Sequence, residues 1–151
     1  MATYRATVSW RLSAGEDFPA GRYSRGHELG FDRGTTVPGT ASAHVVGNKW
    51  SVEGAVDPEQ MLVASLSSCH MLTFLHRARL AGFSVASYAD AAEGVMSEIA
   101  PGRQAVTRVT LHPTIEWSGP APDAETLARL HHEAHEECLI ANSVKTEVVV
   151  A

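Results

Sequence analysis

The sequence predicts a single α+β domain over residues 1–151, with antiparallel sheets around a long buried central helix. Strand patterns come in groups that helical patterns separate, and the longest helical pattern is apolar on nearly every side. A parallel doubly wound sheet would instead need strands and helices in regular alternation. With 44% hydrophobic and 19% charged residues, the chain has the composition of a globular protein that buries a core.

The N-terminal part of the chain favours strands. Residues 4–12 alternate between apolar and polar side chains, which is the period of a strand. Residues 13–21 carry glycine and proline and are typical of a loop. Residues 22–46 hold short strand-like pieces that glycine and proline interrupt, so we expect twisted strands or a hairpin there.

A long helix is expected from Asp57 to about Leu80. Asp57 suits the N-cap, Pro58 the first helical position and Gln60 the capping-box position, while Gly82 ends the pattern. The apolar residues leave no polar face, which is typical of a buried helix. At about 24 residues the helix would be about 36 Å long. A monomer of this size rarely buries a helix of this length on all sides, so we expect a second subunit to cover part of the helix.

The second half of the chain predicts a hairpin, a second helix and a closing strand. Strand patterns over residues 84–96 and 105–117 flank a turn at Pro101 and Gly102. The second helix follows Asp123 as its N-cap, and apolar residues recur every three or four positions up to Cys138. Residues 143–150 are typical of a strand.

Charge and hydropathy narrow the choice of partners. The net charge of −5 offers no basic face for nucleic acid or an anionic membrane surface. The longest apolar stretch, residues 61–66, is far shorter than the roughly 20 residues that cross a bilayer. The N-terminus alternates like a strand and lacks the apolar segment of a signal peptide. We therefore expect a cytoplasmic protein that binds neither nucleic acid nor membrane.

The only two cysteines each lie in an expected helix, Cys69 in the first and Cys138 in the second. A helix holds a sulfur atom in a fixed, partly desolvated position, so the pair suggests a thiol that reacts and a second thiol that resolves it. Two inert core cysteines are the alternative, because free cysteine is among the most buried residue types. A reducing compartment favours a transient disulfide over a permanent one.

Two segments resemble the OsmC/Ohr family of thiol peroxidases, which comprises osmotically inducible protein C and the organic hydroperoxide resistance proteins. In that family a Pro-Glu pair opens the central helix ten residues before the reactive cysteine, as Glu59 does for Cys69 within residues 57–76. The second cysteine stands in a Cys-Pro-Ile-Ser-Asn-Ser-like segment, which residues 136–148 match around Cys138. Here a leucine at position 139 replaces the proline and an alanine at position 141 replaces the first serine.

The resemblance implies an OsmC-like fold, an intertwined homodimer and a cysteine-dependent organic hydroperoxide reductase, an antioxidant enzyme of the stress response. Neither a metal nor a bound organic cofactor is required. The Cys69 thiolate would attack the peroxide and leave a sulfenic acid and an alcohol. Cys138 would condense with that sulfenic acid to a redox-active disulfide. An external dithiol, from a lipoyl protein or a thioredoxin-like protein, would reduce it.

The resemblance also assigns two activating residues. Only a thiolate attacks and a free thiol has a pKa of about 8.5, so Cys69 needs a nearby positive charge at neutral pH. In the family an arginine from the early loop or strand supplies that charge, and the helix-opening glutamate orients it. Glu59 fits the glutamate, and Arg25 is the expected arginine, with Arg22 as the alternative. A carboxylate favoured by the helix dipole and a surface arginine are the ordinary explanations of these residues.

His70 directly follows Cys69 and points about 100° away from it around the helix. We therefore expect His70 to pack or to line the pocket rather than to act as a base. Family members often carry an aromatic residue at this place, so the polarity of His70 bears on the substrate range. The apolar residues around Cys69 favour hydrophobic peroxides over hydrogen peroxide.

Two other functions compete with the peroxidase. His131, His135 and Cys138 fall at i, i+4 and i+7 on one helical face, a spacing that could carry a zinc site. The chain contains neither His-Glu-x-x-His nor CxxC, and a solvated histidine-rich helix edge is the ordinary explanation. Alternatively, the chain is an OsmC-fold stress or ligand-binding protein with little turnover, because loss of the family proline could alter how closely Cys138 approaches Cys69.

Overall fold

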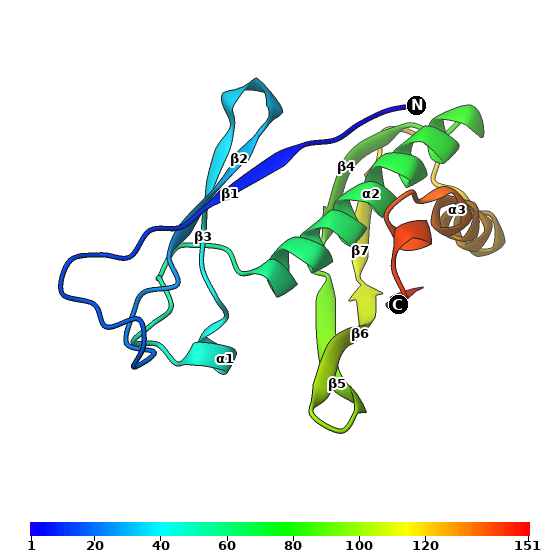
Figure 1. The fold of residues 1–151 in the computed structure, drawn as a ribbon. Coiled ribbons are helices and arrows are strands. Elements are labelled where there is room, and N and C mark those ends of the chain that lie inside the picture. The colour runs from blue at the N-terminus through cyan, green and yellow to red at the C-terminus, as the bar shows by residue number, and fades with distance from the viewer. The chain divides into compact units, whose positions relative to one another are not determined.

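The computed structural model describes all 151 residues, and they adopt the mixed α+β architecture that the sequence predicts (Figure 1). Contacts divide the chain into two compact units, Met1–Met61 and Leu62–Ala151. That the two units form one domain stays a prediction. None of the helices is both long enough and apolar enough to cross a membrane.

The first unit is built on a three-stranded antiparallel sheet in chain order. Its strands are β1 (Ala6–Ser9), β2 (His27–Phe31) and β3 (Thr36–Gly39). The expected hairpin is thus confirmed, and the first strand is shorter than its alternating pattern. The sequence did not predict α1 (Ala43–Val46), one short helical turn that begins where the Ser42 hydroxyl accepts a hydrogen bond from the His44 backbone N–H.

The long helix α2 (Pro58–Leu80) begins and ends as expected. Asp57 Oδ1 accepts a hydrogen bond from the backbone N–H of Gln60 at 2.7 Å, and Gln60 Oε1 accepts one from the N–H of Asp57 at 3.3 Å. This reciprocal pair is a capping box, which satisfies two of the unpaired donors at a helix start. Gly82, with φ of 87°, follows the helix in the left-handed conformation that glycine adopts without steric cost.

Only one stripe of α2 is fully buried in the single chain. Its residues recur every four positions, so they share one face of the helix: Leu66, His70, Phe74 and Ala78. Leu72 and Leu80, by contrast, are 61% and 57% exposed. The expected cover by a second subunit therefore stays a prediction, and these exposed leucines are the side chains that such cover would bury.

The expected hairpin of the second unit bends in its middle and becomes four strands. They are β4 (Val85–Asp90), β5 (Glu93–Ala100), β6 (Arg103–Leu111) and β7 (Pro113–Trp117), with β5 paired to β6 and β4 to β7, both antiparallel. The bend has a polar anchor, because the Asp90 carboxylate accepts hydrogen bonds from the backbone N–H of His112 at 2.7 Å and from the Ser67 hydroxyl of α2. Pro113 begins the next strand, where its missing N–H costs the ladder little.

The chain ends with α3 (Ala124–Glu137) and β8 (Glu147–Val150). Asp123 caps α3 as expected, accepting a hydrogen bond from the Thr126 N–H at 2.8 Å. The prediction that Cys138 lies in the helix is wrong: it is the C-cap, with the extended backbone angles φ −68° and ψ 110°. β8 joins β6 in parallel, because the chain returns to the sheet after crossing it as a helix.

Two apolar clusters hold the second unit together. One joins α2 and α3 through Phe74, Ala78, Leu130 and Ala134. The other joins α2 to the sheet through Leu66, Val109 and Leu111. Gly94 lets the helix approach strand β5 closely, because a Cβ at this position would lie 2.5 Å from Val63 Cγ2.

A pair of histidines joins α2 to α3 between these clusters. His70 is 1% exposed, and its Nε2 lies 3.1 Å from Nδ1 of His131. The two rings are nearly parallel, and the His131 ring also stacks on Phe74 with centroids 4.3 Å apart. Burial, with smaller contributions from His131 and His135, lowers the pKa of His70 to about 4, and Asp90 opposes this only in part. His70 is therefore neutral in the folded protein at neutral pH.

This buried histidine predicts a loss of stability in mild acid. In the unfolded chain His70 takes up a proton as the pH falls through its ordinary pKa of 6.5, whereas the folded protein takes it up only near pH 4. The free energy of unfolding should therefore fall by about 2 kcal/mol between about pH 7 and pH 5 through this group alone. Urea unfolding of the wild type and of His70→Leu at both pH values measures this, with the exposed His76→Gln as control. Equal pH slopes in wild type and His70→Leu would contradict it.

Candidate functional site

The structure brings the two cysteines together. Cys69 lies half-buried on α2, Cys138 lies buried directly after α3, and both are free thiols. The Cys69 side chain lies close enough to Cys138 to raise the pKa of the Cys138 thiol. Almost half of the chain separates the two residues in sequence, so the packing of α3 on α2 creates this pair.

A bonded turn after α3 holds the Cys138 sulfur in place. The backbone N–H of Ala141 donates to Cys138 Sγ at 3.4 Å, and the N–H of Asn142 donates to the Cys138 carbonyl at 3.0 Å. The Asn142 side chain also donates to the Glu136 carbonyl at 2.9 Å. Leu139, which stands where the family has proline, is 72% exposed. The leucine therefore does not prevent the two cysteines from meeting.

The surroundings of Cys138 keep its thiol protonated. Burial raises the pKa of Cys138 above its ordinary value, the neighbouring Cys69 adds to the rise, and the Ala141 N–H opposes it. A thiol is a much weaker nucleophile than a thiolate. The arrangement therefore suits Cys138 for a second step that follows a reaction at the more accessible Cys69.

Glu59 lies in the first turn of α2 and is half-buried. Its Oε2 is buried and has no hydrogen-bond partner. A buried carboxylate oxygen without a donor is costly. The side chain thus has one acceptor free for a cation or an N–H group.

Neither of the expected arginines is paired with Glu59. Arg22 forms an ion pair with Asp17 at 2.8 Å. Arg25 donates from Nη1 to the carbonyls of Gly21 and Tyr23, and its guanidinium lies 3.7 Å from the centre of the Tyr23 ring. No carboxylate pairs with Arg25.

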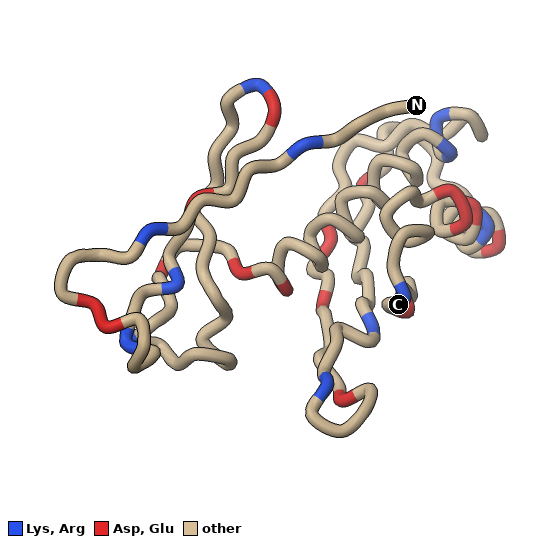
Figure 2. Tube along the Cα trace, viewed as in Figure 1, with Lys and Arg blue, Asp and Glu red and all other residues tan.

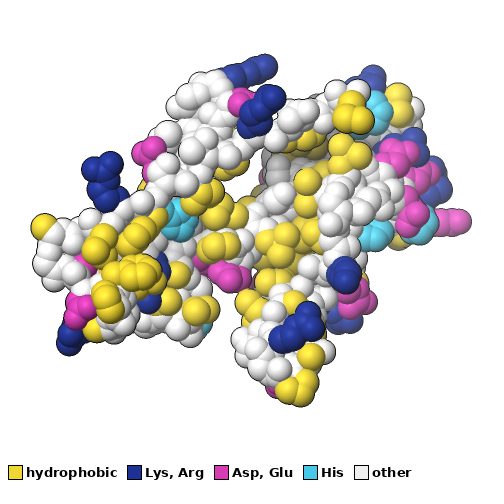
Figure 3. Space-filling model, in the orientation of Figure 1, with side chains coloured by type: hydrophobic (Ala, Val, Ile, Leu, Met, Phe, Trp, Pro, Cys, Tyr) yellow, Lys and Arg dark blue, Asp and Glu magenta, His cyan; other side chains and the backbone are white.

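The sequence analysis missed an aromatic cluster in the first unit. Trp10, Phe18 and Tyr23 contact one another with ring centroids 4.7 to 5.8 Å apart. Trp10 and Phe18 are partly exposed, and Figure 3 shows apolar side chains gathered on this unit. Three aromatic residues in and beside the loop at residues 13–21 were the signal in the sequence. With Arg25 on the Tyr23 face, they form an apolar surface that carries one cation.

The zinc hypothesis is wrong. Nowhere in the chain do three or more His, Cys, Asp or Glu side chains converge closely enough to hold a metal ion. His131 is instead bonded to His70, and Cys138 has left the helical face and meets Cys69. The expectation that His70 packs is confirmed by its burial.

Comparisons with known proteins identify the family. Residues 51–151 match the family of OsmC-like proteins. An OsmC-like protein of unknown function from Vibrio cholerae is 45% identical, with a TM-score of 0.96 over 100% of this chain and 99% of that one. No curated protein is found to be similar to the chain.

More distant structures share the fold. An organic hydroperoxide resistance protein from Elizabethkingia anophelis is 18% identical, with a TM-score of 0.71 over 100% of this chain and 96% of that one. An organic hydroperoxide resistance protein from Legionella pneumophila is 20% identical, with a TM-score of 0.66 over 100% of this chain and 99% of that one. Given the match over two thirds of its length and the close relative, the chain belongs to the OsmC-like protein family.

Proposed function

We propose that the protein is a thiol-based peroxidase that reduces organic hydroperoxides through a Cys69 sulfenic acid and a Cys69–Cys138 disulfide. The observation that carries the proposal is the close pair of free thiols, of which one is more accessible and the other buried with a raised pKa. Family membership supports it, because structures with the same fold are named organic hydroperoxide resistance proteins.

The proposed cycle has three steps. The Cys69 thiolate attacks the terminal peroxide oxygen, the O–O bond breaks, and the leaving alkoxide takes a proton to become an alcohol. The Cys138 sulfur then attacks the Cys69 sulfenic acid, so that an S–S bond forms and hydroxide leaves with the thiol proton as water. A dithiol from a lipoyl protein or a thioredoxin-like protein reduces the disulfide, and both cysteines regain their protons.

Arg25 and Glu59 are proposed to activate the first step. A guanidinium stabilises both a thiolate and the negative charge that develops on oxygen, and a carboxylate holds the guanidinium in orientation. Arg25 and Cys69 belong to different compact units, so the family resemblance links them. In support, Glu59 has a buried oxygen with no donor, and Arg25, unlike Arg22, has no carboxylate partner.

Hydrophobic peroxides are the proposed substrates. Leu72 lies one helical turn after Cys69 on α2, on a neighbouring part of the helix surface, and is exposed. An apolar side chain beside the reactive sulfur favours an alkyl or aryl hydroperoxide over hydrogen peroxide, because only the former gains from removing apolar surface from water.

A homodimer is the proposed assembly. Large apolar side chains stand exposed on α2 and β5: Leu72, Leu80, Val95, Met96 and Ile99. We expect sedimentation equilibrium at micromolar concentration to give twice the chain mass, because a second copy of the chain would remove these exposed apolar side chains from water. The Leu72→Lys/Leu80→Lys double variant should sediment as a monomer. The matched Leu139→Lys, at an exposed leucine outside this surface, should stay dimeric. A monomeric wild type would refute the assembly.

The two cysteines are predicted to play unequal parts. One equivalent of cumene hydroperoxide should remove both free thiols of the reduced wild type. Its intact mass should fall by the mass of two hydrogen atoms, as disulfide formation requires. Cys69→Ser should consume no peroxide. Cys138→Ser should complete one turnover, leave a sulfenic acid that a dimedone probe traps, and then over-oxidise.

Wild-type thiols that stay free after peroxide treatment would overturn the proposed activity. Equal loss of the first turnover in both variants would overturn the division of labour. Circular dichroism of the reduced variants serves as the folding control, since serine differs from cysteine by one atom.

The activating residues are tested by matched arginine variants. Arg25→Gln should lower the second-order rate constant of the peroxide reaction by about 10² to 10³, the usual effect of removing one stabilising donor. Arg22→Gln should change it less than about twofold, because Arg22 is occupied by Asp17. Glu59→Gln should cost about tenfold, as expected for an orienting group. Stopped-flow measurements under single-turnover conditions give these constants. A larger effect at Arg22 than at Arg25 would reverse the assignment.

A further inference from the structure

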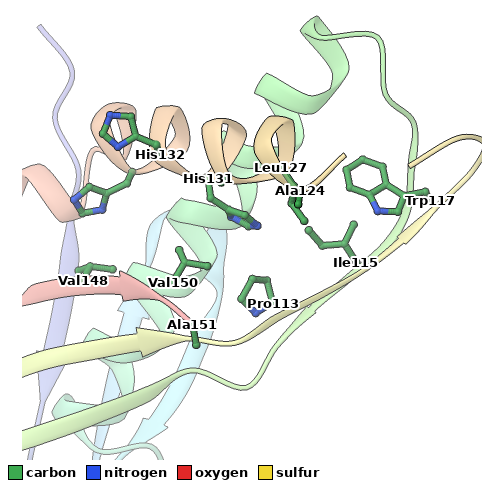
Figure 4. A pocket seen from close by; sticks show the side chains of 12 residues that line it. Pro113, Ile115, Trp117, Ala124, Leu127, His131, His132, Val148, Val150 and Ala151 are labelled. Carbon is green, nitrogen blue, oxygen red and sulfur yellow. The ribbon is translucent and has the colours of Figure 1, made fainter. Parts of the chain in front are cut away.

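The second unit contains a cavity away from the cysteines, between α3 and the strands β7 and β8 (Figure 4). Its volume is about 560 Å³, within the range of pockets that hold small molecules. The apolar part of its wall comes from Ile115 and Trp117 of β7, Leu127 of α3, and Val148 and Val150 of β8. Such walls suit the apolar body of a ligand.

His131 is one of three histidines that line this cavity. Figure 4 shows the His131 ring pointing from α3 between the apolar walls. Its Nδ1 is bonded to His70 Nε2 at 3.1 Å, so Nε2 is the ring nitrogen left for a ligand. His132 and His135 also line the cavity, but no Asp, Glu, Lys or Arg does. The acidic residues of α3, coloured red in Figure 2, are not among the residues that line the cavity.

The hydrogen bond to the buried His70 determines whether Nε2 of His131 is a donor or an acceptor toward a ligand. Burial lowers the pKa of both His70 and His131, so both rings are neutral at neutral pH and share one N–H between them. His70 Nδ1 is buried without a partner. A buried ring nitrogen that has no hydrogen-bond donor costs less free energy than a buried N–H that has no acceptor. His70 therefore donates its Nε2–H to His131, and His131 carries its own proton on Nε2.

We propose that this cavity binds a small monocarboxylic acid with an apolar or aromatic body, whose carboxylate accepts a hydrogen bond from His131 Nε2. The cavity presents imidazole donors, and no Asp or Glu side chain is among its lining residues. Trp117 offers an aromatic surface to the ligand body. Neither cysteine lines the cavity, so this site does not rest on the proposed peroxidase activity.

Phenylacetate and phenylacetamide test the site, because they share their body and differ in charge. Isothermal titration calorimetry on the reduced protein should show phenylacetate binding at least tenfold more tightly than the neutral amide. The imidazole NMR signals of His131 should shift during the titration with phenylacetate. His131→Phe keeps an aromatic ring against Phe74 and removes the donor, so it should bind acid and amide within about threefold of each other.

A cavity-filling variant keeps the test independent of the buried pair. Ala128 is an exposed residue of α3 that lines the cavity, so Ala128→Trp should weaken phenylacetate binding at least tenfold without disturbing the core. Ala121→Trp, at an exposed position outside the cavity, should leave binding unchanged. The proposal is overturned if phenylacetate binds no more tightly than the amide to the wild type, or if it binds Ala128→Trp as tightly as wild type. Cys69→Ser should bind phenylacetate normally, which separates this site from the redox chemistry.

Discussion

The packing of α3 against α2 is the constraint on which the rest of the second unit depends. Phe74 and Leu130 are fully buried in the cluster between the helices, and each such side chain contributes about 1.5 to 3 kcal/mol relative to exposure. Arg77 adds ion pairs to Glu133 at 3.5 Å and Glu137 at 2.7 Å, which are partly exposed and so contribute modestly. This one contact fixes the end of α3 beside the middle of α2. Both the cysteine pair and the histidine pair follow from it.

The end of α3 matters as much as its packing. Cys138 leaves the helix with an extended backbone, and the turn that follows supplies an N–H from Ala141 to its sulfur. Burial and the contact with Cys69 keep the Cys138 thiol protonated. A resolving thiol needs this kind of position, because it must lie close to the reacting sulfur without reacting first. The turn forms with an exposed leucine at position 139.

His70 and His131 form a polar contact within the otherwise apolar core of the second unit. His70 occupies the buried stripe of α2 between Leu66 and Phe74, where an apolar side chain would pack with less desolvation cost. Its bond to His131 offsets part of that cost and fixes which nitrogen of His131 faces the cavity. The same two residues thus link three features of the second unit: the buried stripe, the α2–α3 contact and the cavity beneath α3. His70 is also the immediate neighbour of Cys69 in the chain.

The sequence alone determined the fold class, the long helix and its capping box, the cap of α3 and the family, because these depend on local hydrogen bonding, on side-chain periodicity and on the two cysteine motifs. It placed Cys69 and Glu59 on α2 for the same reason. It misplaced Cys138 inside α3, because the apolar spacing continues through a residue whose backbone has already turned. Only the tertiary structure decided that Cys138 meets Cys69, that His131 is bonded to His70 instead of joining a zinc site, and that a cavity opens beside it. Each of these depends on contacts between residues distant in the chain, and helix packing sets those contacts, whereas local sequence does not.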